Sequence, residues 1–151
     1  LNKLSYGQMK KAVLSFAIAT NAELLLLDEP SNGLDIPSKT LFRRIIVQYV
    51  SDNTCTLIST HQVRDLENLI DPIIILDNKA VLMNASLEKI SEKLYFGLYS
   101  SVPANALFSE PTPGGYLCVM ENEDRGESKV NIEALFNATM HHKSRIKELL
   151  V

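Results

Sequence analysis

The sequence predicts an α/β protein with a parallel sheet flanked by helices and a small α+β region at its C-terminal end. Two observations predict the sheet. Apolar residues recur at helical spacing in two segments near the start of the chain, and three short apolar runs (24–27, 54–60 and 72–77) alternate with helical segments. The order β-α-β-α-β is typical of parallel strands whose faces are both covered by helices.

The first helix is expected over residues 8–19. Its apolar face consists of residues at i, i+3, i+4, i+7 and i+8: Met9, Ala12, Val13, Phe16 and Ala17. Either Ser5 or Gly7 is suited to cap its start, and Asn21 is suited to help end it.

The first strand is the run Leu24–Leu27, which is too short for a helix and is stopped by Pro30. A continuous apolar run of this length indicates a strand buried on both faces. The turn-rich loop SNGLDIPSK follows, and Asp35 with Pro37 opens a second helix. That helix has one apolar stripe, formed by Leu41, Phe42, Ile45, Ile46 and Tyr49.

The rest of the chain contains further predicted strands and helices, and their pattern changes after residue 77. Segment 54–60 is rich in β-formers, 62–70 indicates a short helix, and 72–77 a third buried strand. The segment 78–86 indicates a turn and a short strand. It is followed by a modest helix at 86–94, a hairpin-like strand at 116–122 and a helix capped by Asn131. We therefore place a boundary near residue 85, between a domain of residues 1–85 and an accessory region of residues 86–151.

Composition narrows the class of protein. The 151 residues are 46% apolar, which is enough for a real core, and the net charge of −3 does not indicate general nucleic-acid binding. Cys55 and Cys118 stand far apart, without the spacing of a zinc site or a disulfide framework. The sequence shows no membrane-spanning run and no signal peptide. Because the chain starts at Leu1 with an abrupt motif, we expect it to be a fragment of a longer protein.

Acidic and imidazole side chains follow two of the predicted strands. Asp28 and Glu29 end the first strand, and His61 comes just after the second. In an open parallel sheet ligands bind beyond the carboxyl ends of the strands. Asp28 suits the hydrated Mg²⁺ ion, Glu29 is suited to polarise an attacking water, and His61 to contact a terminal phosphate. Such a set fits phosphoryl transfer, in which the protein mainly positions groups and stabilises charge.

Four motifs then appear in one order: LSYGQ (4–8), LLLLDE (24–29), PSNGLD (30–35) and ISTHQ (58–62). Together they resemble the signature motif, Walker B motif, D-loop and switch-histidine loop of ABC-family ATPases. The resemblance covers residues 1 to about 86, and it implies part of a P-loop NTPase-type sheet. The remainder resembles the variable C-terminal appendage of many such proteins.

The resemblance implies a role for each matching residue. Glu29 and His61 would be catalytic, as the base acting on water and the switch histidine, and Asp28 would support Mg²⁺ through water. The D-loop at a dimer interface would consist of Ser31, Asn32, Gly33, Leu34 and Asp35. The signature residues that contact ATP held by the opposite protomer would be Ser5, Tyr6, Gly7 and Gln8. The implied ligands are ATP and Mg²⁺.

The sequence departs from the family pattern in four ways. Tyr6 stands where the family usually has glycine, and Ser31 replaces the more usual threonine but keeps the hydroxyl. None of the six glycines is followed by lysine, so the P-loop sequence G-x-x-x-x-G-K-[ST] is missing. The strand that stacks adenine is missing as well. We therefore expect the chain alone to be inactive as an ATPase.

The resemblance implies ATP hydrolysis by a dimeric ABC ATPase that powers transport across a membrane. Its partners would be a second ATPase subunit, identical or different, and a membrane permease that holds it at the cytoplasmic face. No nucleic-acid partner is expected. The motif sequences LSYGQMKK and LDEPSNGLD resemble those of exporter-type subunits more than those of importers. Two alternatives stay open: a soluble ABC ATPase acting on ribosomes or nucleic acid, and a non-catalytic interaction module.

For three further features we expect a solvent-exposed or core-packing role. Lys10 and Lys11 are expected on the solvent face of the first helix, with a phosphate contact as the alternative. His141 and His142 are adjacent, so they point differently on a helix and indicate surface solvation rather than a metal site. The apolar face of the last helix indicates core packing, with contact to another subunit as its alternative.

Overall fold

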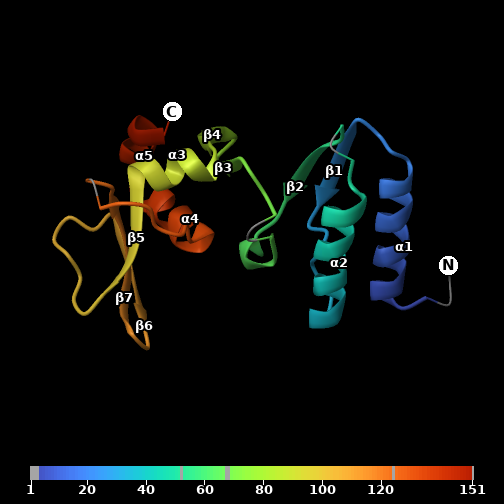
Figure 1. The fold of residues 1–151 in the computed structure, drawn as a ribbon, viewed down its shortest axis with the longest axis horizontal. Coiled ribbons are helices and arrows are strands. Elements are labelled where there is room, and N and C mark those ends of the chain that lie inside the picture. The colour runs from blue at the N-terminus through green and yellow to red at the C-terminus, as the bar shows by residue number, and fades with distance from the viewer. Residues whose placement is uncertain (1–3, 52, 67–68, 124, 151) are drawn as a thin grey trace. The chain divides into compact units, whose positions relative to one another are not determined.

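The structure is a computed structural model that describes residues 4–51, 53–66, 69–123 and 125–150. The chain forms two compact units, Leu1–Leu69 and Ile70–Val151, which we describe separately (Figure 1). This division precedes the third strand, whereas the boundary predicted from the sequence lies near residue 85. The functional division into residues 1–85 and 86–151 stays a prediction. Among the described residues, no helix combines the length and apolar character needed to cross a membrane.

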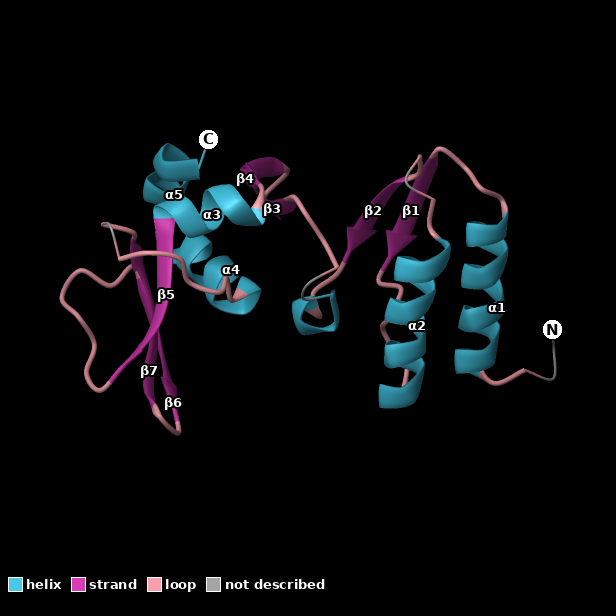
Figure 2. Ribbon diagram, viewed as in Figure 1, coloured by secondary structure: helices cyan, strands magenta, loops and turns pink. Residues whose placement is uncertain are grey.

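The first unit is built on two parallel strands joined through a helix (Figure 2). Its elements are α1 (Tyr6–Ala19), β1 (Leu24–Asp28), α2 (Ile36–Tyr49), β2 (Cys55–Ser59) and the 3₁₀ helix η1 (Val63–Leu66). The strands pair in parallel from Leu24 opposite Cys55 to Asp28 opposite Ser59. The predicted β-α-β order is therefore confirmed for this unit. The short helix expected over 62–70 is seen as η1, while residues 67 and 68 lie outside the described residues.

Side chains along β1 alternate between a buried and an exposed face. Leu25 is buried, whereas Leu24 and Leu26 remain 56% and 64% exposed. Successive strand residues point to opposite sides, so a run of leucines is buried on both faces only if both sides of the sheet are covered. The expectation that β1 is buried on both faces is therefore wrong for this structure.

Side-chain caps fix where the helices of this unit begin. The Ser5 hydroxyl accepts a hydrogen bond from the Gln8 amide (3.3 Å), and the Gln8 side chain accepts one from the Ser5 amide (2.9 Å). Ser5, and not Gly7, therefore caps the helix, and α1 begins at Tyr6 instead of the predicted residue 8. In α2 the Asp35 carboxylate accepts a hydrogen bond from the Ser38 amide (2.9 Å), as predicted from Asp35 and Pro37 at the start of this helix. The apolar side of α1 is open to solvent, with Phe16 74% exposed.

The second unit begins with an antiparallel hairpin of β3 (Ile73–Asp77) and β4 (Ala80–Ala85). Within this unit β3 pairs with β4 in the described residues; its predicted place in the parallel sheet stays a prediction. Asn78 and Lys79 between them both have positive φ, 46° and 65°. Two such residues form the tight turn that matches the twist of a hairpin, and this local pairing closes a much shorter loop than a crossover does.

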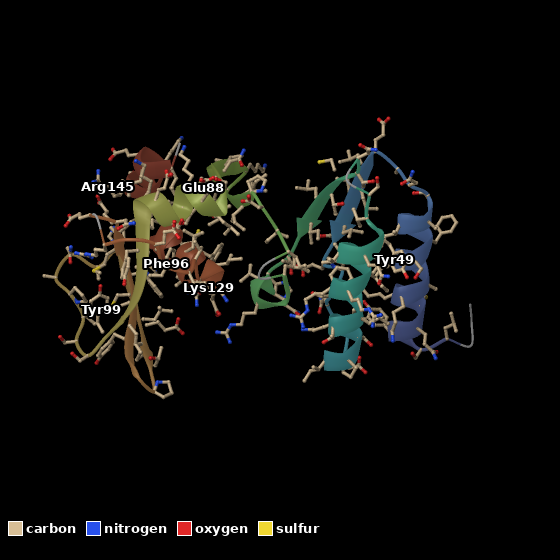
Figure 3. All side chains as sticks on the ribbon, in the orientation of Figure 1. Tyr49, Glu88, Phe96, Tyr99, Lys129 and Arg145 are labelled. Carbon is tan, nitrogen blue, oxygen red and sulfur yellow. The ribbon has the colours of Figure 1, made fainter. Side chains whose placement is uncertain are left out.

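The remaining elements form one core. They are α3 (Leu87–Lys93), β5 (Leu94–Tyr99), β6 (Phe108–Thr112), β7 (Gly115–Glu121), α4 (Ile132–His141) and α5 (Lys143–Leu150). The sheet has the order β5-β7-β6 and is antiparallel throughout, with β7 central. Leu94, Val119, Leu135 and Ile146 are fully buried, so strands and helices share this core. Phe96 of β5, also buried, is labelled in Figure 3.

The predicted strand near residues 116–122 and the helix capped by Asn131 are confirmed. The Asn131 side chain accepts a hydrogen bond from the Ala134 amide (2.9 Å). His142 ends α4, and α5 follows directly. Ile132 and Leu135 of α4 are buried, as the core-packing reading expects, whereas Phe136 is 43% exposed.

Candidate active site

The candidate site lies where β1 and β2 end, at one edge of the parallel pair. Asp28 is the last residue of β1, and its register partner Ser59 is the last of β2. The Ser59 hydroxyl donates a hydrogen bond to the Asp28 carboxylate. Two parallel strands ending in register thus place an oriented carboxylate at this edge, as the sequence predicts.

Glu29 follows Asp28 in a left-handed backbone conformation. Its φ is 44°, which is uncommon for a residue with a side chain. The Glu29 amide donates to the Ser59 carbonyl (2.9 Å), and the Asn32 amide donates to the Glu29 carbonyl (3.2 Å). The strand therefore turns sharply at Glu29, and its side chain is directed away from that of Asp28 to the loop after β2.

The Glu29 carboxylate contacts both residues of that loop. It accepts hydrogen bonds from the His61 amide (2.9 Å) and the Thr60 hydroxyl (3.1 Å), and the His61 ring nitrogen Nδ1 lies 2.6 Å from Oε1. Side chains of Glu29 and His61 are 29% and 68% exposed, so both reach solvent. The structure thus brings together the acid and the imidazole that the sequence singled out.

These contacts set the charge of Glu29. Burial alone raises the pKa of its carboxyl, but hydrogen bonds from His61 and Thr60 outweigh that effect and lower the pKa below its ordinary value. The carboxylate is therefore ionised at neutral pH. An ionised carboxylate held by two neighbours can orient and polarise a water molecule at the open side of the site.

The segment after Glu29 forms a turn ending in the cap of α2. Ser31 is fully buried, the Leu34 amide donates to the Ser31 carbonyl (3.2 Å), and Asp35 caps the helix. Hydrogen bonds from the Ser38 side chain and amide lower the pKa of the Asp35 carboxyl. The Asn32 side chain accepts a weak bond from Gln62 (3.4 Å), which links this turn to the His61 loop.

The N-terminal motif touches the same turn within one chain. Ser5 and Gln8 are engaged in their capping box, and a Cβ atom added to Gly7 would lie 4.0 Å from Leu34. The Tyr6 ring lies against Gly33, where an added Cβ would be 2.9 Å from the ring. Tyr6 is the first residue of α1, so its backbone is right-handed and needs no glycine.

Three residues of this site were not predicted. Thr60 binds Glu29, Gln62 binds Asn32, and the Lys10 ammonium donates to the carbonyls of Glu29 (2.8 Å) and Asn32 (2.7 Å). Thr60 and Gln62 are the sequence neighbours of His61, so their closeness to a predicted site residue could have identified them. Lys10, expected on the solvent face, instead reaches this turn. Its one sequence signal is its place four residues after Tyr6 on the helix.

The oxygen donors of the site fit part of the coordination shell of a hydrated Mg²⁺ ion. Asp28 offers a carboxylate, and Ser59 beside it offers a hydroxyl. Mg²⁺ in nucleotide sites takes one or two carboxylates and completes its shell with water and phosphate oxygens. Among the described residues no cluster of three or more His, Cys, Asp or Glu side chains is poised to hold a metal.

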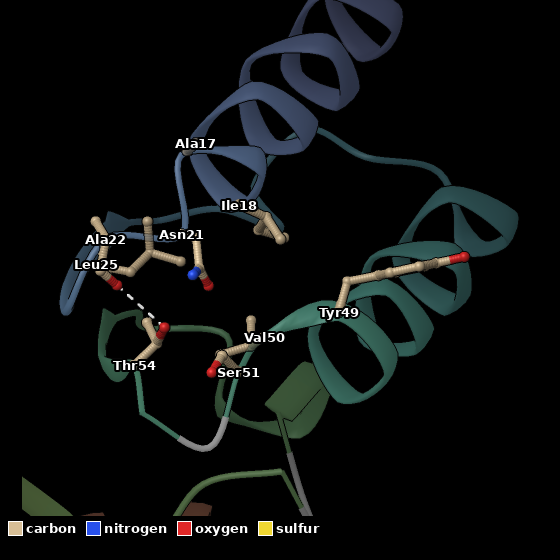
Figure 4. Close-up of a pocket in the computed structure, with 9 residues that line it drawn as sticks. All are labelled: Ala17, Ile18, Asn21, Ala22, Leu25, Tyr49, Val50, Ser51 and Thr54. Carbon is tan, nitrogen blue, oxygen red and sulfur yellow. Dashed lines mark hydrogen bonds between the residues drawn. The ribbon is translucent and has the colours of Figure 1, made fainter.

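A shallow pocket lies at the opposite, amino end of the strands (Figure 4). It is lined by Ile18, Leu25 and Tyr49 among others, and the Thr54 hydroxyl donates to the Ala22 carbonyl (3.0 Å) across it. No carboxylate or imidazole lines this pocket. Its chemistry is therefore unlike that of the edge formed by Asp28, Glu29 and His61.

Comparison with curated proteins finds ATP-binding proteins of ABC transporters and of transport systems among the relatives. The chain is 31% identical over 109 residues to the zinc import ATP-binding protein of Buchnera aphidicola, 71% of this chain and 45% of that protein. It is 30% identical over 112 residues to the manganese transport system ATP-binding protein of Synechocystis, 72% of this chain and 43% of that protein. The ABC transporter ATP-binding protein NatA of Bacillus subtilis is 31% identical over 88 residues, 58% of this chain and 36% of that protein.

These matches cover most of this chain but only part of each relative. The chain spans less than half the length of these curated relatives, between 36% and 45%. No protein-family model matches it.

Proposed function

We propose that this chain, which is related to the ATP-binding proteins of ABC transporters, supplies the water-activating half of an ATP hydrolysis site that powers transport. The observation that carries the proposal is the pairing of Glu29 with His61 beside Asp28, at the strand edge where such a site is expected. The relatives are all named as ATP-binding proteins of transporters or transport systems. Their names and this geometry support the same reaction class.

In the proposed reaction the Glu29 carboxylate accepts a hydrogen bond from a water molecule. The water oxygen attacks the γ-phosphorus of ATP while one of its protons passes to the Glu29 carboxylate, the bond from that phosphorus to the bridging oxygen breaks, and ADP and phosphate form. His61, 68% exposed beside Glu29, donates to a γ-phosphate oxygen and senses its departure. Asp28 and Ser59 would hold Mg²⁺ through its water shell, and that ion would neutralise charge on the phosphates.

The N-terminal motif is proposed to act on a second subunit. The first amides of α1 have no partner within the helix, and the helix dipole favours an anion there. Ser5, Tyr6, Gly7 and Gln8 would therefore contact the γ-phosphate of ATP held by the opposite protomer. The turn of Ser31, Asn32, Gly33, Leu34 and Asp35 would lie at the interface between the two subunits.

The proposed partners are a second ATPase subunit and a membrane permease, which would hold the complex at the cytoplasmic face. Two relatives are named for metal uptake systems or metal transport, and a third group for cobalt import. These names favour import over the export direction that the motif wording predicts. Copurification with a multi-span membrane protein is the expected result, whereas sedimentation with ribosomes would point to the soluble alternative.

The 151-residue chain on its own carries no P-loop sequence, so we expect no measurable ATPase activity from it. The functional test therefore needs a complete ATP-binding subunit that includes these residues. Robust turnover by the 151-residue chain would show that the phosphate cradle is supplied in some other way.

The test of the catalytic assignment is the substitution Glu29→Gln. The amide keeps the shape of the side chain but removes the charge that polarises water, so steady-state turnover should fall about 100-fold or more, within the range attributed to a general base. The matched control is Glu23→Gln, one residue before β1 and exposed. Turnover of Glu29→Gln near the wild-type rate would remove Glu29 from the reaction.

A further inference from the structure

The Lys10 side chain bridges two carbonyl oxygens of the turn that follows β1. Its ammonium nitrogen Nζ lies 2.8 Å from the Glu29 carbonyl and 2.7 Å from the Asn32 carbonyl. The Asn32 amide also donates to the Glu29 carbonyl, at 3.2 Å. The Glu29 carbonyl therefore accepts two hydrogen bonds, and both hold the left-handed turn closed.

Tyr6 adds a second contact from the same helix. The Lys10 ammonium lies 5.6 Å from the centre of the Tyr6 ring, within the range of a cation–π interaction. The ring also occupies the space beside Gly33, whose φ is 74°. A side chain at position 33 would meet the Tyr6 ring and strain the backbone at once. Tyr6 and Lys10 are four residues apart on one side of α1, so this helix contacts the Glu29–Gly33 segment at two points.

We propose that Lys10, oriented by Tyr6, is a positioning residue that fixes the Glu29–Gly33 turn and thereby aims the Glu29 carboxylate at Thr60 and His61. The catalytic part of this inference rests on the proposed ATPase function; the structural part does not. Lys10 touches neither the water nor the phosphate in this account, and it acts through the main chain of Glu29.

The chemistry of the contact explains why a cation is needed. An ammonium group has three donors and no acceptor, so it can satisfy two carbonyls at once. Arginine also presents several donors, whereas methionine of similar length presents none. Lys10→Arg should therefore retain the link between α1 and the turn, and Lys10→Met should break it.

The first measurement uses the 151-residue chain and needs no ATPase activity. Backbone amide hydrogen exchange should show the Asn32 and Leu34 amides exchanging at least about fivefold faster in Lys10→Met than in the wild type. In Lys10→Arg their rates should stay within about twofold of the wild type. Equal rates in all three proteins would overturn the structural link itself.

The second measurement uses a complete subunit and separates positioning from binding and folding. Lys10→Met should lower kcat about tenfold, leave KM for ATP within about twofold, and leave the amount of ATP bound per subunit unchanged; Lys10→Arg should restore kcat. Lys147→Met, an exposed lysine of α5, is the charge-matched control with unchanged kinetics.

Three outcomes contradict the catalytic part. These are a kcat unchanged by Lys10→Met, a Lys10→Arg as impaired as Lys10→Met, and an effect confined to KM, which would make Lys10 a phosphate ligand. Glu29→Gln is measured in parallel. If Glu29→Gln also leaves turnover unchanged, the proposed function has failed, and the exchange experiment alone decides the role of Lys10.

Discussion

The left-handed backbone of Glu29 decides what two neighbouring acids can do. With φ at 44°, Glu29 leaves the strand and meets Thr60 and His61, while Asp28 stays on the strand and meets Ser59. A residue with a side chain pays of order 1–3 kcal/mol for such a conformation, so the surrounding hydrogen bonds must stabilise it. The two carboxylates thus take different partners although they are adjacent in sequence.

Ser31 offers a stability test in the same turn. Its hydroxyl is buried and, within the described residues, has no hydrogen-bond partner, whereas the Ser38 hydroxyl bonds to the Asp35 carboxylate. An unpartnered buried hydroxyl costs about 1–3 kcal/mol, so Ser31→Ala should raise the free energy of unfolding by roughly 0.5–1 kcal/mol. Ser38→Ala should lower it by about 1 kcal/mol.

Urea unfolding of the wild type and both variants, followed by far-UV circular dichroism, measures this difference. The two substitutions remove the same oxygen atom from the same kind of residue, so each serves as the control for the other. A loss of stability in Ser31→Ala equal to that in Ser38→Ala would mean that the Ser31 hydroxyl is satisfied after all.

Sequence reasoning found Asp28, Glu29 and His61 because polar residues directly after apolar strands are conspicuous. It missed Lys10, since the partners of Lys10 are main-chain carbonyls and their positions follow from the φ of Glu29. Residue type does not reveal that angle: glutamate is an unusual choice for it. The contact of Tyr6 with Gly33 was hidden for the same reason, because the loop path was unknown.

Among the helices and strands, the helix caps were easier to predict from the sequence than the pairing of the strands. The caps Ser5, Asp35 and Asn131 all follow from local residue patterns, and each is seen in the structure. The partner of the third strand was not readable, because an apolar run such as 73–77 fits a parallel or an antiparallel neighbour. Asn78-Lys79 decided it in favour of the hairpin, although Asn-Lys is a weaker turn signal than Asn-Gly.

An ion pair links two elements of the second unit. Arg145 of α5, labelled in Figure 3, donates two hydrogen bonds to the Glu121 carboxylate at the end of β7, at 2.6 and 2.7 Å. These bonds lower the pKa of the Glu121 carboxyl, although its burial acts in the opposite direction. Side chains of Arg145 and Glu121 are 48% and 31% exposed, so solvent weakens the pair.

The pH dependence of this contribution has a definite sign. A carboxyl whose pKa is lowered by folding stabilises the protein above its unfolded pKa, about 4.3, and loses that effect as pH falls through the folded pKa. Glu121→Gln should therefore be less stable than the wild type at pH 7. The difference should be smaller at pH 3 than at pH 7. Urea unfolding at both pH values measures it, and a constant difference would contradict the pair's role.

At the scale of the whole molecule, the two units differ in how completely they bury their apolar residues. In the second unit strands and helices enclose Leu94, Val119, Leu135 and Ile146. In the first unit Leu24, Leu26 and Leu57 are 52–64% exposed on the sheet. The relatives are more than twice as long as the part that this chain matches. The sequence predicted the α/β class and the strand edge, but not which faces remain uncovered.

We propose that Glu29 drives the hydrolysis step and not the binding of ATP. The most direct test is the identity of the nucleotide that remains bound to a complete subunit after incubation with ATP and Mg²⁺. Glu29→Gln should retain mainly uncleaved ATP, in an amount equal to that bound by the wild type at saturation, while the wild type should retain mainly ADP. Mainly ADP on Glu29→Gln, formed at the wild-type rate, would contradict it.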